Sequence, residues 1–363
     1  MREAIRLTRR GRLTDATALL LGALRGKPAG PATVGDTAAT VAGSLAGARP
    51  GLWARAKQPR PPTLDIIPEN AQWLAKSYTN QAGTRAYKLY VPSGYRRQPL
   101  PLIVMLHGCT QSPDDFAAGT GMNGLGEERT CLVAYPAQAA SANPSKCWNW
   151  FRPRDQQRGQ GEPSLIAGIT REIIDGYSVD RRRVYIAGLS AGAAVAAIMG
   201  MAYPDIYAAI GVHSGLACGA AHDLSSALAA MSQGDGGAGR PSGETTLSQA
   251  PRRLVPTIVF HGDRDTTVNP CNGDRVIAQS TAAAPTELRK TMQQGQVAGG
   301  HAYRRTLYAD ACGHAVIEHW LIYGAGHAWS GGSPAGSYTD PRGPDASREM
   351  LRFFLENPTQ LGD

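Results

Sequence analysis

Short apolar runs alternate with longer helix-type stretches from about Ser77 onward. Residues 85–93 alternate apolar and polar side chains, as a half-buried strand does. Six further apolar runs have the length of strands, and they lie at 101–108, 131–137, 182–190, 207–215, 256–263 and 317–327. Helix-type patterns lie among them at 163–178, 191–203, 273–284 and 345–357. This alternation predicts an α/β fold with a mostly parallel sheet and helices on both faces.

Two segments lack this pattern. Residues 1–26 place apolar side chains near helical spacing, and residues 27–62 are rich in Gly, Ala and Pro. We therefore expect an amphipathic helix and a linker over residues 1–62, followed by one large domain over residues 63–363. Within that domain, residues about 219–250 are rich in Gly and Ser. They are expected to form an excursion over the edge of the sheet.

Polar side chains collect where the apolar runs end. Gly188-Leu189-Ser190-Ala191-Gly192 stands between a strand-type and a helix-type run. One interpretation is a tight corner built from small residues. The other is a nucleophile turn, in which glycines let strand and helix approach closely while Ser190 takes a strained backbone. The following helix would then offer the free N–H of Ala191. This context favours Ser190 as a nucleophile.

A serine nucleophile needs a base and an acid. His327 follows the last strand-type run and is flanked by glycines, so its loop can reach back over Ser190. Asp263 and Asp265 follow the preceding run. We favour Asp265 as the partner that orients His327, since Asp263 lies so close to the strand end that it is expected to cap the turn. The chain order Ser190, Asp265, His327 is that of an α/β-hydrolase.

Residues at the other strand ends are candidates for an oxyanion donor and for histidines that orient loops. The backbone N–H of Cys109, at a His-Gly turn that ends the 101–108 run, is the expected second oxyanion donor beside Ala191. Cys109 as a nucleophile is disfavoured because no base lies next to it. Histidines that follow other strands are expected to orient loops by hydrogen bonding, and these are His107, His213 and His261.

Tryptophans lie in loops near the same ends. Trp148, Trp150 and Trp329 could cover the edges of the core. Alternatively, they line the cleft as a flat apolar wall that binds an acyl or hydroxyacyl chain.

Composition removes several classes of function. The formal net charge is +8 over 363 residues, but no compact Lys/Arg block occurs, so no nucleic-acid partner is expected. No apolar stretch reaches the roughly 18 residues that a membrane span needs. Six cysteines show no metal-ligand spacing, which makes a metal site unexpected and leaves disulfide pairing open. Arg9-Arg10 before a short apolar run resembles a twin-arginine export signal. Asp15 precedes that run and no small-x-small cleavage site follows closely, so a cytoplasmic location is favoured over export.

Several motifs occur in an order that resembles esterases related to polyhydroxybutyrate depolymerases, a group that includes feruloyl and acetylxylan esterases. They are LHGCTQ (106–111), NPSKCWNWF (143–151), GLSAG (188–192), HGDRDTTV (261–268), GAGHAWSGG (324–332) and YTDPRGPDAS (338–347). The resemblance implies hydrolysis of short hydroxyacyl or acyl esters by Ser190, Asp265 and His327 without a cofactor. It also implies a disulfide between Cys109 and Cys147.

Three hypotheses about function are compatible with these residues. The first is an esterase that acts on poly(3-hydroxybutyrate) or its oligomers through an acyl-enzyme. The second is a feruloyl or acetylxylan esterase, and the third is a non-catalytic relative that binds a ligand. The apolar-faced helix within residues 1–26 could dock to a polyester granule. The oligomeric state is left open.

Overall fold

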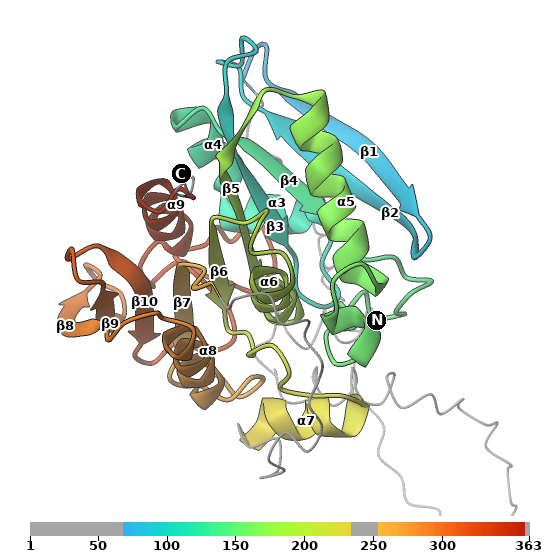
Figure 1. The fold of residues 1–363 in the computed structure, drawn as a ribbon. Helices are drawn as coiled ribbons and strands as arrows, with labels where there is room; N and C mark the ends of the chain where they lie inside the picture. The colour runs from blue at the N-terminus through green and yellow to red at the C-terminus, as the bar shows by residue number, and fades with distance from the viewer. Residues whose placement is uncertain (1–67, 234–252, 360–363) are drawn as a thin grey trace, which may run out of the picture.

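A ten-stranded sheet organises the protein in the computed structural model, which describes residues 68–233 and 253–359 (Figure 1). Its strands are β1 (Gln72–Asn80), β2 (Gly83–Val91), β3 (Leu100–Leu106), β4 (Leu132–Pro136), β5 (Val179–Leu189), β6 (Ala209–His213), β7 (Thr257–Gly262), β8 (Arg289–Gln296), β9 (Ala302–Ala309) and β10 (Ala315–Ile322). The helices are α3 (Pro113–Thr120), α4 (Met122–Glu128), α5 (Gly161–Gly176), α6 (Ala191–Ala202), α7 (Leu224–Gln233), α8 (Cys271–Ala282) and α9 (Ala346–Glu356), with a short 3₁₀ turn η1 (Pro153–Gln156). A second sheet pairs β11 (Trp329–Ser330) with β12 (Thr339–Asp340).

The centre of the large sheet is parallel and its two edges are antiparallel. Across the sheet the order is β1-β2-β4-β3-β5-β6-β7-β10-β9-β8. Strands β4, β3, β5, β6, β7 and β10 run parallel to one another. The pairs β1–β2 and β9–β8 extend the sheet antiparallel at its two ends. The carboxyl ends of the parallel strands therefore meet at one edge, where ligand sites of open α/β sheets lie.

Helices cover both faces of the sheet and bury two separate cores. Helices α5, α6 and α8 pack on one face and contribute Ile166, Ala193 and Val276 to the first core. Helices α3, α4 and α9 pack on the other and contribute Phe116, Met122 and Phe353 to the second. Neighbouring residues of β3 alternate between the two cores, as side chains of a strand must. The predicted α/β-hydrolase architecture is thus confirmed.

Every strand and helix expected between residues 85 and 357 is present with small shifts of its ends, but further elements were not expected from the sequence. They are β1, α3, α4, η1, α7, β8, β9, β11 and β12. Strand β8 is exposed or half-buried along its whole length, so its sequence carries no apolar alternation. Backbone hydrogen bonds pair β8 with β9 at the edge of the sheet, and such bonds leave no hydrophobic pattern in the sequence.

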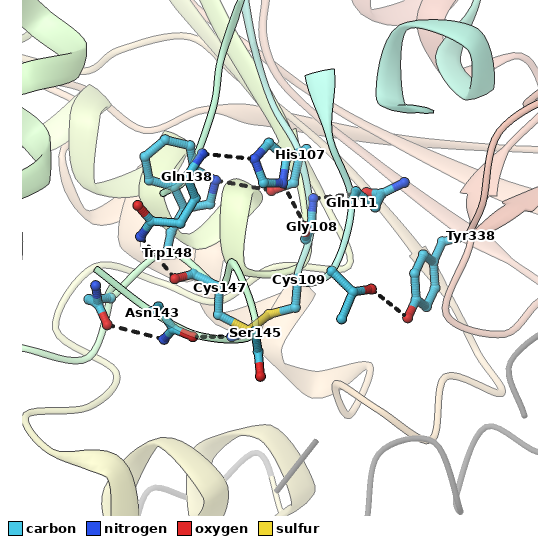
Figure 2. Close-up of a disulfide and its surroundings, with 12 residues drawn as sticks. His107, Gly108, Cys109, Gln111, Gln138, Asn143, Ser145, Cys147, Trp148 and Tyr338 are labelled. Atoms are coloured by element: carbon cyan, nitrogen blue, oxygen red, sulfur yellow. Dashed lines mark hydrogen bonds between the residues drawn. A yellow bond between two sulfur atoms is a disulfide. The ribbon is translucent and has the colours of Figure 1, made fainter. Parts of the chain in front are cut away.

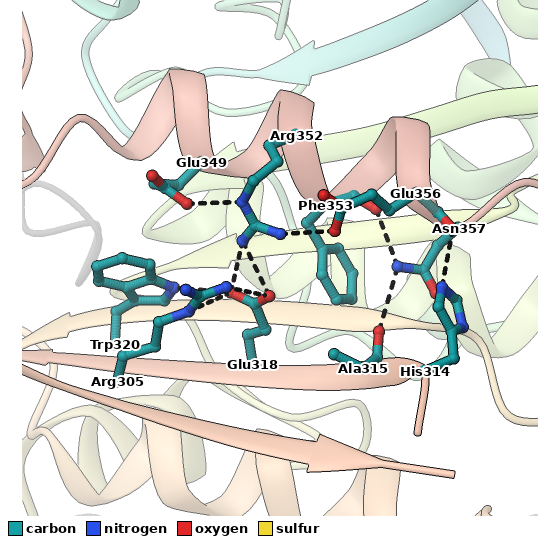
Figure 3. A network of polar contacts seen from close by, with 10 residues as sticks. All are labelled: Arg305, His314, Ala315, Glu318, Trp320, Glu349, Arg352, Phe353, Glu356 and Asn357. Atoms are coloured by element: carbon teal, nitrogen blue, oxygen red, sulfur yellow. Dashed lines mark hydrogen bonds and ion pairs between the residues drawn. The ribbon is translucent and has the colours of Figure 1, made fainter. Parts of the chain in front are cut away.

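A buried ion network fixes α9 against the antiparallel end of the sheet (Figure 3). Glu318 of β10 is fully buried and accepts bonds from Arg305 of β9 at 2.8 and 3.1 Å. Arg352 of α9 also donates to both oxygens of Glu318, at 2.9 Å each. A carboxylate buried there is stable because two guanidinium groups neutralise and solvate it. The helix that supports the second core is thereby held in place.

The predicted N-terminal helix and linker lie outside the described residues, as does most of the predicted Gly/Ser-rich excursion. Helix α7 occupies part of the latter segment, and residues 234–252 fall outside the description. The boundary of the large domain near residue 63 therefore stays a prediction.

Candidate active site

The strand-to-helix turn after β5 has the strained geometry of a nucleophile elbow. Ser190 has φ 57° and ψ −119°, a backbone conformation that non-glycine residues rarely adopt. A Cβ on Gly188 would lie 2.4 Å from the Gly192 carbonyl carbon, and one on Gly192 would lie 2.1 Å from the Leu106 carbonyl oxygen. Both positions therefore require glycine, because backbone atoms occupy the space of a side chain. The sequence motif thus has a steric cause.

The structure joins two of the three predicted catalytic residues directly. His327 Nδ1 lies 2.7 Å from Asp265 Oδ2. Asp265 Oδ1 accepts bonds from the N–H groups of Thr267 and Val268, both at 2.9 Å. Burial alone would raise the pKa of the Asp265 carboxyl, but the His327 charge and the contacts with His261 and His327 outweigh burial and hold this pKa well below its usual range. Asp265 is therefore an ionised acceptor that orients His327.

Asp263 has a different contact. Its Oδ1 accepts a bond at 2.6 Å from the N–H of Gly324, in the turn that precedes His327. Asp263 thus caps this turn, while the contact with His327 belongs to Asp265.

The segments that carry Ser190 and His327 are connected through His213. Both residues are nearly buried, at 8% and 6% exposure. The N–H of Ser190 donates to the carbonyl of His213 at 2.9 Å, and the ring of His213 contacts the N–H of Ser330, three residues after His327. The structure contains no hydrogen bond between Ser190 Oγ and His327, a contact that often tightens only when substrate binds. The complete triad therefore stays a prediction.

The turn after β3 leaves one backbone donor free. Its Gly108, Thr110 and Gln111 N–H groups donate to the Gln111 side chain, the Ser145 carbonyl and the Gly108 carbonyl respectively. The N–H of Cys109 donates to no acceptor among the described residues. A Cβ on Gly108 would lie 3.6 Å from Ser190 Cβ, so this turn stands beside the nucleophile. Ala191 opens α6, so its N–H also lacks an intrahelical acceptor.

His107 orients the peptide group that carries the free N–H of Cys109. Its Nε2 accepts from the N–H of Gln138 at 3.1 Å, so the proton sits on Nδ1 and is donated to the Gly108 carbonyl at 2.7 Å. That carbonyl shares a planar peptide with the N–H of Cys109, so holding the oxygen aims the N–H the opposite way. His107 thus orients its loop by hydrogen bonding, as expected from the sequence, while the contact of Gln111 with the same turn was not anticipated.

A disulfide closes the other side of this turn (Figure 2). Cys109 and Cys147 are bonded, which confirms the pairing that the resemblance implies. The bond also removes Cys109 as a free thiol nucleophile. The loop of Cys147 is anchored by buried Glu162, which accepts bonds from Asn149 N and Nδ2 at 2.8 and 2.7 Å. Glu162 was not anticipated, because nothing in its local pattern marks it as buried.

Two of the three tryptophans that were expected to line the cleft are buried in the core. Trp148 and Trp329 are 0% and 1% exposed, so their rings form core, not the wall of an open cleft. Their indole N–H groups donate to the carbonyl of His107 and the hydroxyl of Ser347, at 3.1 and 3.0 Å. Large aromatic rings gain more from full burial than from lining a surface. Trp150 is 5% exposed, and its role in substrate binding stays a prediction.

The described residues contain neither a group of metal ligands nor a membrane-spanning helix. Within residues 68–233 and 253–359, no three His, Cys, Asp or Glu side chains form a group that could hold a metal ion. In the same part of the chain, no helix is both long and apolar enough to cross a bilayer.

The buried neutral state of His107 predicts a pH-dependent stability. Burial lowers its pKa to about 4, against about 6.5 in the unfolded chain. Between these values the unfolded state binds the proton and the folded state does not, so stability falls as pH drops. In urea titrations between pH 6 and 4.5, the His107→Phe variant should lose less stability than the native protein, by about 1 kcal/mol per pH unit. Equal slopes for the two proteins would contradict this assignment.

Comparison with known proteins is consistent with this geometry. A family model described as esterase PHB depolymerase matches residues 85–284, more than half of the chain. Poly(3-hydroxyalkanoate) depolymerase C of Paucimonas lemoignei is 33% identical over 69% of this chain and 59% of its own length. Feruloyl esterase B of Thermothelomyces thermophilus is 29% identical over 66% of this chain and 82% of its own.

The solved structures support the fold. An acetyl xylan esterase from Aspergillus awamori superposes with a TM-score of 0.58 at 20% identity, over 79% of this chain and 99% of its own. The chain spans less than two thirds of the depolymerase that it matches. The family match, the order of the motifs and the turn at Ser190 together place the chain in the esterase family of the PHB depolymerases.

Proposed function

We propose that the chain is a serine esterase that cleaves esters of short hydroxyacyl or acyl units through an acyl-enzyme. The observation that carries this proposal is the buried Asp265–His327 pair, combined with a serine held on a strained turn beside a free backbone donor. The alternative of a non-catalytic binding protein is disfavoured, since no member of this set is replaced.

The proposed mechanism assigns one step to each group. His327 Nε2 takes the proton of Ser190 Oγ as this oxygen attacks the ester carbonyl carbon. The negative charge on the carbonyl oxygen is stabilised by the N–H groups of Cys109 and Ala191. His327 then returns the proton to the leaving alkoxide oxygen, and Asp265 stabilises the imidazolium throughout. A water activated by the same imidazole releases the acyl group and restores Ser190.

The preferred substrate class is a hydroxyacyl ester, poly(3-hydroxybutyrate) or its oligomers. The family match and the relative named as a polyhydroxyalkanoate depolymerase support this choice. Feruloyl or acetylated carbohydrate esters are the second candidate. They are supported by the similarity to feruloyl esterase B. The match covers 82% of that esterase, compared with 59% of the depolymerase.

A substrate panel tests this choice. We expect kcat/KM for 3-hydroxybutyrate oligomers to exceed that for methyl ferulate and for acetylxylan by at least tenfold, a difference of about 1.4 kcal/mol in transition-state binding. Initial rates of acid release at a fixed pH would provide the comparison. A tenfold preference for ferulate or acetylxylan would instead establish the second candidate.

We further propose that the protein works in an oxidising compartment, and not in the cytoplasm as the N-terminal pattern favoured. The Cys109–Cys147 bond supports this, because disulfides persist outside reducing compartments. Docking of the N-terminal helix to a polyester granule also remains a proposal, and those residues lie outside the described part of the chain.

A further inference from the structure

The geometry points to His213 as a positioning residue that connects the nucleophile turn to the loop of the catalytic base. This inference rests on the proposed function and deepens it. His213 has no place in the proposed proton transfers, yet it is fully buried where the catalytic loops meet. It contacts one of these loops through its main chain and another through its ring.

The main chain of His213 holds the nucleophile. His213 ends β6 and is paired with Leu189, the last residue of β5. Its carbonyl oxygen accepts the N–H of Ser190 at 2.9 Å. The backbone nitrogen of Ser190, where the strained turn begins, is thus hydrogen-bonded to the neighbouring strand β6.

The ring of His213 holds the loop of the base. Nε2 lies 3.0 Å from the backbone nitrogen of Ser330, which can only donate. The Nε2 lone pair must therefore accept, and the ring proton belongs on Nδ1, which lies 3.3 Å from the hydroxyl of Ser214. Because Ser330 comes three residues after His327, this bond fixes the outgoing side of the loop that carries the base.

Aromatic contacts hold the ring in the plane that this bond needs. The ring of Trp329 stacks on His213 with centroids 5.0 Å apart and an angle of 24°. The ring of Phe260 in β7 stacks at 5.8 Å and 11°. Strand β7 leads into the loop of Asp265, and Trp329 follows His327 by two residues. The imidazole therefore contacts the segments of both the acid and the base.

A purely structural role would need only a flat ring that fills this space. Phenylalanine would keep the stacking but offer no acceptor, so the N–H of Ser330 would be buried without a partner. Glutamine loses the ring but can place its Oε1 near the position of Nε2. Asparagine is as polar as glutamine but one carbon shorter, so its amide does not reach Ser330. These three variants separate the acceptor from packing and from polarity.

The test measures kcat and KM for p-nitrophenyl butyrate, with far-UV circular dichroism to establish that each variant is folded. We expect His213→Phe to lose about 100-fold in kcat, as small misplacements of catalytic groups do, with KM changed less than threefold. His213→Gln should recover to within about fivefold of the native kcat. If His213→Phe does not fold, the His213→Gln and His213→Asn pair makes the same comparison, and at least a tenfold advantage for Gln is expected.

Three results would overturn the inference. The first is a folded His213→Phe variant with kcat within threefold of native. The second is a loss of activity that appears only as a higher KM. The third is an equal loss of kcat in His213→Gln, which keeps the acceptor, and in His213→Phe or His213→Asn, which lack it. Failure of the proposed function looks different. In that case the native protein does not hydrolyse the ester, or its hydrolysis survives the Ser190→Ala substitution.

Discussion

Replacing Ser190 by alanine should lower kcat for p-nitrophenyl butyrate by about 10⁶-fold, the largest effect expected for any substitution in this chain. The substitution removes the only atom that forms the covalent bond, and His327 then has no hydroxyl to activate. Its residual rate over the uncatalysed reaction would come from the oxyanion donors and substrate binding. Alanine fits the same turn, since the hydroxyl adds little to the strain at positive φ.

Ser164 provides a matched control. It lies in the first turn of α5, where its hydroxyl donates to the Gly161 carbonyl at 2.8 Å and accepts from Asn80 Nδ2 at 3.2 Å. Ser164→Ala should keep kcat within twofold of native. Initial rates of p-nitrophenol release, corrected for the rate without protein, give both values. A Ser190→Ala variant that keeps more than a hundredth of the native kcat would exclude Ser190 as the nucleophile.

Replacing Asp265 by asparagine should lower kcat by about 10⁴-fold. Oδ1 faces two backbone N–H groups, so the amide oxygen must occupy that position and the NH₂ group must face His327. His327 Nδ1 would then have to accept instead of donate, which moves its proton to Nε2. The imidazole in that tautomer cannot take the proton of Ser190.

Asp263→Asn is the companion variant, made two residues away. The amide oxygen can still accept the N–H of Gly324, so kcat should stay within threefold of native. Steady-state kinetics at saturating substrate distinguish the two positions. If Asp263→Asn were the more damaging change, the assignment of the acid would have to be exchanged between these residues.

The sequence predicts the central sheet because burial on both faces leaves long apolar runs. Strands such as β3 and β5 are therefore recognisable, and so is the serine turn, whose glycines are required by backbone contacts at Gly188 and Gly192. The choice of Asp265 over Asp263 also follows from sequence, because the residue nearer the strand end is used to cap the turn.

Other features depend on contacts between distant segments. The exposed strand β8 has no pattern of its own and forms by pairing at an edge. A tryptophan in a loop looks the same in sequence whether it is buried, as Trp148 is, or faces a cleft. The contacts of the Glu162 side chain join residues 13 or more positions apart, as does the bond between His213 and Ser330. Such partners become visible only when the chain is folded.

Covalent labelling identifies the nucleophile most directly. The native protein would be treated with a fluorophosphonate, digested, and its peptides analysed by mass spectrometry. We expect one adduct, on the peptide that contains Ser190, formed at a rate that falls sharply in Asp265→Asn. An adduct on any other residue, or continued ester hydrolysis by fully labelled protein, would contradict this expectation.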